Sequence, residues 1–226
     1  MSRTLVITGA STGIGAQTAR DAVSVGWNVA LAARGADKLE ALSSELGGSA
    51  IAVPTDVTDF DQLEALIAAA SDRFGGVDAV FANAGFGAKR GFTEETVEHW
   101  RDMVLTNVLG TALTIRAAMP QIIERKGHFV LTGSVAGVRA LPGSFYSSTK
   151  FAVHGMAESL RQELNGTGAR VTLIAPGMVD TPFFDNGAGP GSLVADDIAR
   201  AVIFALSQPE SVDVNMLLVR PTAQDA

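Results

Sequence analysis

The chain contains a single tyrosine, and a lysine follows it four positions later. Tyr146 and Lys150 stand in the stretch FYSSTK of a chain of 226 residues. Residues four apart project from the same face of a helix, one turn apart, so the ammonium group can act on the phenol. A phenol beside a cation can exchange protons with a substrate. The alternative interpretation is a chance pair on the surface.

The pKa of a tyrosine determines what this pair can do. Moving the pKa of Tyr146 from about 10 to about 7 requires roughly 4 kcal/mol of preference for the phenolate. An ammonium about 4.5 Å away provides only ~1 kcal/mol in water, but on the order of 4 kcal/mol at an effective dielectric constant of 20. We therefore expect Lys150 to lower the pKa of Tyr146 inside a pocket that is sheltered from water.

A glycine-rich turn follows the first apolar run of the chain. The run TLVIT (4–8) is followed by Gly9, Gly13 and Gly15 in the stretch TGASTGIG. Glycines let a backbone turn tightly and approach a diphosphate, while the next helix presents free N–H groups and the positive end of its dipole. The turn predicts a dinucleotide-binding site. The alternative is a plain turn between a strand and a helix.

The same turn also fits the G-x-S-x-G pattern of a hydrolase nucleophile, with Ser11 at its centre. A hydrolase of this type needs an acid and then a histidine after the serine, with the histidine close to the end of the domain. The histidines are His99, His128 and His154, and a long stretch of chain follows the last of them. A hydrolase is therefore the weaker alternative.

The end of the second apolar run bears on the choice of cofactor. Enzymes that select NAD usually offer a carboxylate there, which binds the ribose 2′-hydroxyl. This chain instead has Ala33 and Arg34. A guanidinium can pair with a 2′-phosphate in bidentate fashion, so Arg34 favours NADP (NADPH). The alternative is an arginine that faces solvent.

Short apolar runs alternate with segments of helical period, and these elements must position the residues above. We expect strands at 4–8, 28–33, 50–54, 77–82, 128–133, 170–175 and 214–219. We expect helices near 14–25, 36–46, 59–74, 96–125, 145–165 and 195–207. Near-continuous apolar strands joined by helices predict a parallel sheet that is covered on both faces. The expected fold class is α/β: one Rossmann-like domain over residues 1–226, doubly wound, with about seven parallel strands.

The segment 59–74 shows the helical pattern well. We expect Thr58 to cap this helix at its N-terminus. One apolar stripe runs along the segment, and it consists of Phe60, Leu63, Ile67, Ala70 and Phe74.

Composition excludes several classes of function. Hydrophobic residues make up 47% of the chain against 18% charged, so a large core is expected. The absence of cysteine excludes disulfides, thiolate nucleophiles and cysteine-based zinc sites, and no histidine pair has metal-ligand spacing. A net charge of −7 opposes nucleic-acid binding. The first glycine, Gly9, comes too early for a signal peptide and no apolar run is long enough to span a membrane, so we expect a soluble, cytoplasmic protein.

These motifs, taken together and in order, resemble the short-chain dehydrogenase/reductase family over essentially the whole chain. The matching positions are Thr8-Gly9-x-x-x-Gly13-x-Gly15, Asp56-Val57, Asn83-Ala84-Gly85, Asn107, Ser134, Tyr146-x-x-x-Lys150, and Pro176-Gly177 with Thr181. The cofactor-binding residues that the resemblance and the turn imply are Gly9, Ser11, Thr12, Gly13, Ile14, Gly15, Arg34, Asp56, Val57, Asn83, Ala84, Gly85, Tyr146, Lys150, Pro176, Gly177, Val179 and Thr181.

The resemblance implies an NADP-dependent ketoreductase or alcohol dehydrogenase, which moves a hydride between NADPH and a secondary alcohol or ketone. Tyr146 would be the acid/base, and Lys150 would lower its pKa and bind the nicotinamide ribose. Ser134 would hold the substrate oxygen, and Asn107 would anchor a water that relays protons. A catalytically silent NADP-binding sensor or scaffold is the alternative, against which the intact catalytic set argues.

The resemblance also bears on assembly and on the substrate pocket. The helices near 96–125 and 145–165 pair between subunits in this family, so a homo-oligomer, most often a tetramer, is expected. The glycine-rich stretch 185–192 is either a mobile flap over the site or an ordinary surface loop. Residues that could line an apolar substrate pocket, or pack in the core, are Phe86, Val135, Leu141, Met178, Phe183 and Phe184.

Overall fold

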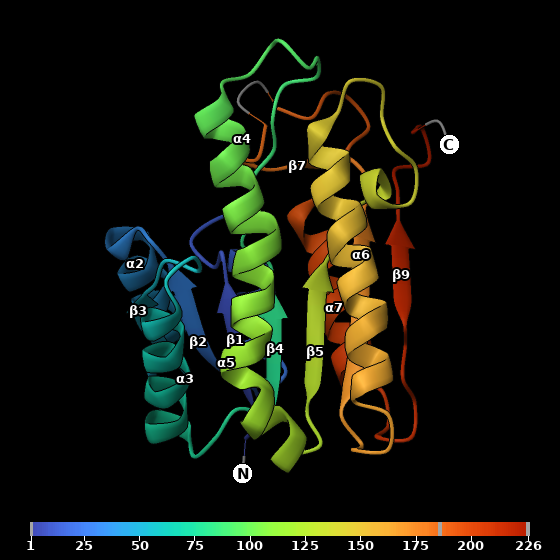
Figure 1. Ribbon diagram of the computed structural model, residues 1–226. Helices are drawn as coiled ribbons and strands as arrows, with labels where there is room; N and C mark the ends of the chain where they lie inside the picture. The colour runs from blue at the N-terminus through green and yellow to red at the C-terminus, as the bar shows by residue number, and fades with distance from the viewer. Residues whose placement is uncertain (1, 185–186, 225–226) are drawn as a thin grey trace.

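The computed structural model of the protein describes residues 2–184 and 187–224. Within them, seven strands form one parallel sheet in the order β3-β2-β1-β4-β5-β6-β9 (Figure 1). The strands are β1 (Thr4–Thr8), β2 (Asn28–Ala33), β3 (Ala50–Pro54), β4 (Ala79–Ala82), β5 (His128–Thr132), β6 (Arg170–Pro176) and β9 (Met216–Val219). The chain first winds from β1 towards β3 and then returns to build outward from β4. Ligands of such sheets bind beyond the carboxyl ends of the strands, at this reversal between β1 and β4.

Helices cover both faces of the sheet, as the near-continuous apolar strands require. The helices are α1 (Gly13–Ser24), α2 (Ala36–Leu46), α3 (Phe60–Phe74), α4 (Val97–Val104), α5 (Thr111–Glu124), α6 (Phe145–Glu163) and α7 (Ala195–Ser207). Leu63, Ile115 and Val153 bring α3, α5 and α6 into one buried core, which lies in front of the sheet in Figure 1. Leu39 and Val202 belong to the second core, on the opposite face, with α1, α2 and α7.

The predicted doubly wound α/β sheet is confirmed, and most predicted boundaries agree with the structure to within two residues. The strand predicted at 77–82 begins only at Ala79, because the N–H of Val77 bonds to the side chain of Gln121 instead of joining the ladder. The last strand begins at Met216, after an irregular segment in which the Asn215 side chain donates to Asp213. The long helix predicted at 96–125 consists of α4, a π-helical turn over Leu105–Gly110, and α5.

The N-terminus of α3 corrects one prediction. The helix begins at Phe60, and its cap is Asp59, whose carboxylate accepts hydrogen bonds from the N–H groups of Asp61 and Gln62. The hydroxyl of Thr58 instead donates to Asp56 at 2.8 Å. Thr58 is therefore part of the preceding turn, and the prediction of a Thr58 cap was wrong.

A small parallel pair of strands, which was not predicted, lies at the carboxyl edge of the main sheet. It joins β7 (Val179–Asp180) to β8 (Leu193–Val194). Asp185 and Asn186, which begin the predicted flap, lie outside the described residues. Strands of two residues carry no periodic pattern that a sequence could reveal.

None of the described helices is both long and apolar enough to cross a membrane. Across residues 2–184 and 187–224, no group of three or more histidine, aspartate or glutamate side chains is placed to hold a metal ion.

Candidate active site

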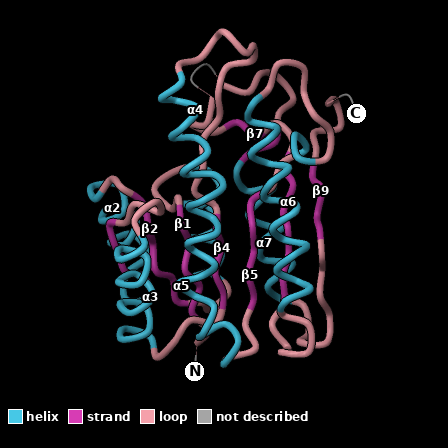
Figure 2. The backbone as a smooth tube through the Cα atoms, viewed as in Figure 1, coloured by secondary structure: helices cyan, strands magenta, loops and turns pink. Residues whose placement is uncertain are grey.

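A cavity of about 810 Å³ lies where the strands of the main sheet end. Its wall comes from the loops that follow β1, β2, β3, β4, β5 and β6, together with the first turns of α6. Figure 2 shows that the longest of these loops gather beyond the carboxyl edge of the sheet. The topology therefore brings residues that are far apart in the sequence to one site.

The glycine turn after β1 forms one end of the cavity. Gly9 and Gly13 have positive φ angles of 66° and 55°, which glycine adopts at little cost. A Cβ atom on Gly9 would lie 2.9 Å from the Cα of Ala84, and one on Gly15 would collide with the carbonyl oxygen of Gly9. The first two glycines face the cavity, whereas Gly15 does not line it and instead lets α1 pack against the turn.

The N-terminus of α1 opens onto the same end of the cavity. Thr12 precedes the helix in an extended conformation, and its side chain makes no capping hydrogen bond. The first N–H groups of a helix need acceptors and carry a partial positive charge, so they suit a phosphate. The turn and the uncapped helix therefore fit the diphosphate of a dinucleotide.

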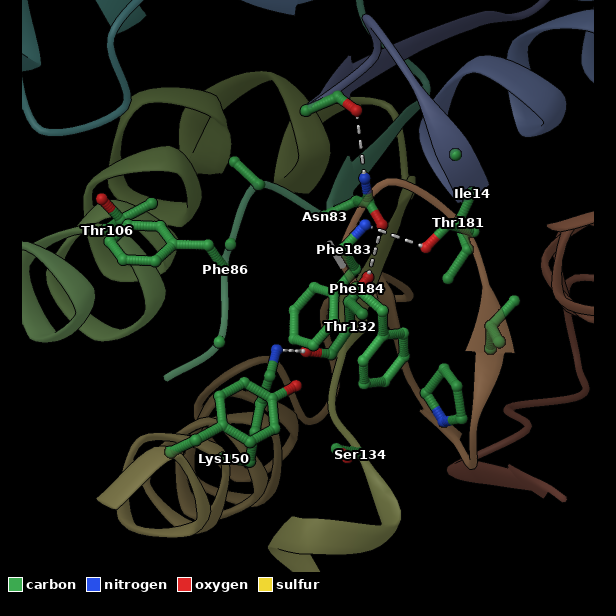
Figure 3. A pocket seen from close by; sticks show the side chains of 18 of the residues that line it. Ile14, Asn83, Phe86, Thr106, Thr132, Ser134, Lys150, Thr181, Phe183 and Phe184 are labelled. Carbon is green, nitrogen blue, oxygen red and sulfur yellow. Dashed lines mark hydrogen bonds between the residues drawn. The ribbon is translucent and has the colours of Figure 1, made fainter. Parts of the chain in front are cut away.

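A hydrogen-bonded network links three strand ends to α6. The side-chain amide of Asn83 donates to the carbonyl of Thr8 at 3.1 Å, and the hydroxyl of Thr132 donates to Asn83 at 3.1 Å. The ammonium of Lys150 donates a hydrogen bond to the carbonyl oxygen of Thr132 at 2.7 Å, which Figure 3 draws as a dashed line. These bonds hold Lys150 at the ends of β1, β4 and β5.

Tyr146 and Lys150 lie on the first two turns of α6, as the spacing predicts. Ser144 caps this helix by accepting a hydrogen bond from the N–H of Ser147 at 3.2 Å. The Nζ atom of Lys150 lies 5.6 Å from the centre of the Tyr146 ring, and both side chains line the cavity. The phenol and the ammonium therefore share one site.

The pKa of Tyr146 moves in the direction opposite to the expected one. Burial of the hydroxyl raises this pKa, and the nearby hydroxyl of Ser134 acts in the opposite direction with a smaller effect. Burial also lowers the pKa of Lys150 to about 8. The ammonium is directed at Thr132, so it does not offset the desolvation of the phenol. Tyr146 is therefore a protonated acid at neutral pH in this structure.

Ser134 caps the short 3₁₀ turn Val135–Gly137 that follows β5, and its hydroxyl accepts a hydrogen bond from the N–H of Ala136 at 3.1 Å. The N–H of Ser134 donates to Nε2 of His154 at 3.4 Å. A Cβ atom on Gly133 or Gly137 would lie 2.6 Å from the His154 ring, so the imidazole packs closely against both glycines. His154 therefore contacts the backbone that carries Ser134.

Asn107 is buried in the π-helical turn and does not line the cavity. Its amide donates to the carbonyl of Phe86 at 2.9 Å and to Thr149 at 3.2 Å, and its oxygen accepts from the N–H of Phe86 at 3.0 Å. A Cβ atom on Gly85 would lie 2.9 Å from the same oxygen. The side chain of Asn107 thus positions the loop after β4 against α6, and its role in a proton relay stays a prediction.

Arg34 follows β2 and is exposed on the cavity wall. A second cavity of about 510 Å³ adjoins the first and shares with it Arg34, Asp56, Phe86 and Thr106. The carboxylate of Asp56 accepts hydrogen bonds from the N–H and the hydroxyl of Thr58, and these bonds together with the charge of Arg34 lower its pKa. This end of the site combines a guanidinium with a carboxylate that is held in place.

Aromatic side chains line the other end of the cavity. The ring of Phe183 lies 5.6 Å from that of Tyr146 and 5.1 Å from that of Phe184, with edge-to-face geometry in both pairs. A Cβ atom on Gly87 would lie 2.9 Å from Phe183, so this ring reaches across to the loop after β4. Val135, Leu141, Met178 and Phe86 also line the wall. Figure 3 shows the Phe183 and Phe184 rings together on the side of the site opposite to Phe86.

The structure brings nearly all of the predicted site residues to one cavity. On the wall lie Gly9, Ser11, Thr12, Gly13, Ile14, Arg34, Asp56, Val57, Asn83, Ala84, Gly85, Ser134, Tyr146, Lys150, Pro176, Gly177, Val179 and Thr181. Gly15 and Asn107 lie off the wall, for the packing reasons given above. Arg90, His99, Thr132 and Gln224 line the cavity but were not predicted there. Arg90 and Gln224 lie on loops, for which the sequence carries no periodic signal, whereas Thr132 ends β5 and His99 lies on α4.

Comparisons with known proteins agree with this geometry. A family model described as short chain dehydrogenase matches residues 3–188. An uncharacterized oxidoreductase of Staphylococcus aureus is 40% identical over 221 residues, which cover 96% of each chain. The structure of an alcohol dehydrogenase from the archaeon Thermococcus sibiricus, complexed with 5-hydroxy-NADP, superposes with a TM-score of 0.93 at 32% identity, over 100% of this chain and 99% of that one. Serine dehydrogenase from Escherichia coli superposes with a TM-score of 0.90 at 30% identity, over 99% of this chain and 100% of that one.

Proposed function

The chain belongs to the short-chain dehydrogenase/reductase family of oxidoreductases, and from this we propose that it catalyses hydride transfer between NADPH and a ketone, or the reverse reaction on a secondary alcohol. Membership in this family rules out the hydrolase alternative. The observation that carries the proposal is the convergence of Tyr146, Lys150 and Ser134 on one cavity, beside a glycine turn that suits a diphosphate.

The residues present fit a bound nicotinamide dinucleotide. The turn from Gly9 to Gly13 and the uncapped start of α1 would hold the diphosphate, and Asp56 with Val57 would lie at the adenine. Lys150, at the end of the network through Thr132, would hold the nicotinamide ribose. When bound, this cofactor supplies or accepts the hydride, which is chemistry that amino-acid side chains do not provide.

Proton transfer is the part of the reaction that this chain's own residues perform. Because burial raises the pKa of Tyr146, the phenol is protonated at neutral pH and can donate its proton to a carbonyl oxygen as that oxygen becomes an alcohol. Ser134 would donate a hydrogen bond to the same oxygen and hold it near the phenol. Oxidation of an alcohol needs a proton acceptor, whereas reduction of a ketone needs a proton donor. The protonated phenol of Tyr146 therefore suits the reduction.

We further propose that NADPH is preferred over NADH. Arg34 stands at the end of β2, where a carboxylate would favour NAD, and its exposed guanidinium is available to a 2′-phosphate. The structural neighbour from Thermococcus sibiricus carries an NADP derivative, which is in line with this preference.

We also propose that the protein forms a homotetramer and is located in the cytoplasm. The side chains of Val97, Ile123 and Phe151 are 74%, 40% and 44% exposed on α4, α5 and α6, which are the helices expected to pair between subunits. Burial of such side chains between copies would stabilise an oligomer.

The substitution Tyr146→Phe tests the proposed function. A panel of ketones would be supplied with NADPH, and the loss of absorbance of the reduced cofactor would be followed. We expect turnover to fall by at least about a thousandfold, since the proton donor is lost. Cofactor affinity, measured by NADPH fluorescence, should stay within about threefold of wild type because the ring is retained.

The alternative of a silent NADP-binding sensor predicts a different result. A sensor would bind NADPH yet turn over no carbonyl compound in the panel, and Tyr146→Phe would then change nothing. Wild-type turnover that survives this substitution would instead contradict the role given to the phenol.

A further inference from the structure

The charges on the cavity wall are opposite in sign to those of the chain as a whole. Among residues 2–184 and 187–224, the wall carries the cations of Arg34, Arg90 and Lys150 and one carboxylate, that of Asp56, although the net charge of the protein is −7. The carboxylate is already bonded to the N–H and hydroxyl of Thr58. A cavity lined by one sign of charge concentrates ligands of the opposite sign. The site is therefore built for anions.

Two of the three cations have tasks within the proposed function. Arg34 stands at the strand end that faces a 2′-phosphate, and Lys150 is 5% exposed and bonded to the carbonyl of Thr132. Arg90 is exposed on the loop after β4, and it takes part in none of the ion pairs between described residues. The nearby carboxylate of Glu95 accepts from the N–H of Lys89 and lies 3.8 Å from His99. Arg90 thus has no ion-pair partner in the part of the chain that the structure describes, and no cofactor group is assigned to it.

The position of Arg90 places it beside the catalytic helix. The N–H of Gly91 donates to the carbonyl of Gly143 at 2.8 Å, and a Cβ atom on Gly143 would lie 3.7 Å from the carbonyl carbon of Arg90. Gly143 directly precedes Ser144, the cap of the helix that carries Tyr146. Arg90 and Ser144 line the same cavity as the phenol, so Arg90 borders the space where the substrate must lie.

We propose that the substrate is an oxo acid or hydroxy acid and that Arg90 binds its carboxylate. This inference rests on the proposed function. A planar guanidinium matches a carboxylate in bidentate fashion, and a single side chain suits one negative charge better than a phosphate dianion. The carboxylate at Arg90 would orient the carbonyl carbon and oxygen towards Tyr146 and Ser134, while the rings of Phe86 and Phe183 would cover the aliphatic part.

The test compares an acid with its neutral ester in three variants. The substrates are 4-oxopentanoate and acetoacetate with their methyl esters, each reduced by NADPH. Arg90→Gln removes the cation, and Lys89→Gln is the matched control, since it removes the adjacent cation, which does not line the cavity. Arg90→Lys keeps the charge but loses the bidentate geometry.

We expect the wild type to reduce at least one acid with a kcat/KM at least about tenfold higher than that of its ester. This is the difference expected when the ester lacks one charged hydrogen-bonded pair. Arg90→Gln should lower kcat/KM for the acid by at least about tenfold, mostly through KM, and leave the ester within about twofold. Arg90→Lys should recover part of the loss, and Lys89→Gln should leave both substrates unchanged.

The outcomes separate this inference from the proposed function. Equal turnover of acids and esters, or equal losses in Arg90→Gln and Lys89→Gln, would overturn the carboxylate site and leave the reductase intact. Faster reduction of the esters or of other neutral ketones than of the acids would also overturn the carboxylate site and leave the reductase intact. If neither acids, esters nor any member of the ketone panel is reduced, both the inference and the proposed function fail.

Discussion

The ammonium group of Lys150 joins α6 to the sheet. It donates to the carbonyl of Thr132, and it lies 5.6 Å from the centre of the Tyr146 ring. The hydroxyl of Thr132 in turn donates to Asn83. Because burial lowers the pKa of Lys150 to about 8, its charge is present below that pH and is lost as the pH rises through it. The ammonium that is bonded to Thr132 is therefore charged at neutral pH but not in strongly alkaline solution. Lys150, Thr132 and Asn83 are thus linked by hydrogen bonds although they lie far apart in the sequence.

The proposed preference for NADPH rests on a single side chain, that of Arg34. We expect Arg34→Ala to weaken NADPH binding by at least about tenfold and to change NADH binding by less than about threefold, because only NADPH has a 2′-phosphate. Fluorescence titration of both cofactors measures this. Lys38→Ala is the control, since it removes an exposed cation of α2 that does not line the cavity. Tighter binding of NADH than NADPH by the wild type would contradict the assignment.

At the scale of elements, the π-helical turn between α4 and α5 is what brings Asn107 against the loop after β4. Its last residue is Gly110, where a Cβ atom would lie 2.6 Å from Val57, so the glycine admits the loop that follows β3. The hydroxyls of Thr111 and Thr114 donate hydrogen bonds to the carbonyls of Asn107 and Gly110 in this turn, at 2.8 and 2.7 Å. The irregular turn therefore connects two loops of the site.

The cap of α3 gives a prediction at the same scale. We expect Asp59→Ala to lower the free energy of unfolding by about 1 kcal/mol, because the N–H groups of Asp61 and Gln62 lose their acceptor. Urea denaturation measures the change. Asp61→Ala is the matched control, since it removes a carboxylate from the same turn without removing the cap. A larger loss in Thr58→Ala than in Asp59→Ala would restore Thr58 as the cap.

Across the whole molecule, the carboxyl edge and the amino edge of the main sheet differ in function. The carboxyl edge carries the cavity, while the amino edge holds β5, β6 and the end of α7 together. There, buried His128 bonds to Thr172 at 2.8 Å, and Arg170 donates to the carbonyls of Gln208 and Val212. Burial lowers the pKa of His128 to about 3, and the charge of Arg170 adds to this effect. The amino edge is therefore sensitive to acid.

The sign of this effect follows from linkage. His128 stays neutral in the folded protein down to about pH 3, whereas an unfolded histidine binds a proton near about pH 6.5. The unfolded chain binds more protons in that window, so the free energy of unfolding falls as the pH falls through it. Between pH 7 and pH 5 we expect His128 to account for on the order of 1 to 2 kcal/mol of that fall.

The substitution His128→Gln checks this expectation, because glutamine can still bond to Thr172 but does not titrate. Urea denaturation at pH 7 and at pH 5 gives four free energies of unfolding. The difference in free energy of unfolding between the two proteins at pH 7 reports the change in packing. A smaller change in this free energy between pH 7 and pH 5 in the variant reports the titration of His128. An equal dependence on pH in both proteins would show that His128 does not cause the effect.

The sequence by itself determined the α/β sheet, the order of its elements and most of the residues on the cavity wall. The bounds of β1, β2, β3, α2 and α7 agree with the predicted ones, because apolar periodicity is a local property of the chain. The glycine turn and the spacing of Tyr146 and Lys150 are also local, so their geometry could be predicted from the residues and from the family resemblance.

Only the tertiary structure decided the partners of these groups. It directs Lys150 to Thr132, Asn107 to Phe86 and His154 to the backbone of Ser134. It also raises the pKa of Tyr146, where the spacing alone had suggested a lower value. Desolvation and hydrogen bonding depend on atoms that lie close in space but far apart along the chain, and no local pattern contains that information.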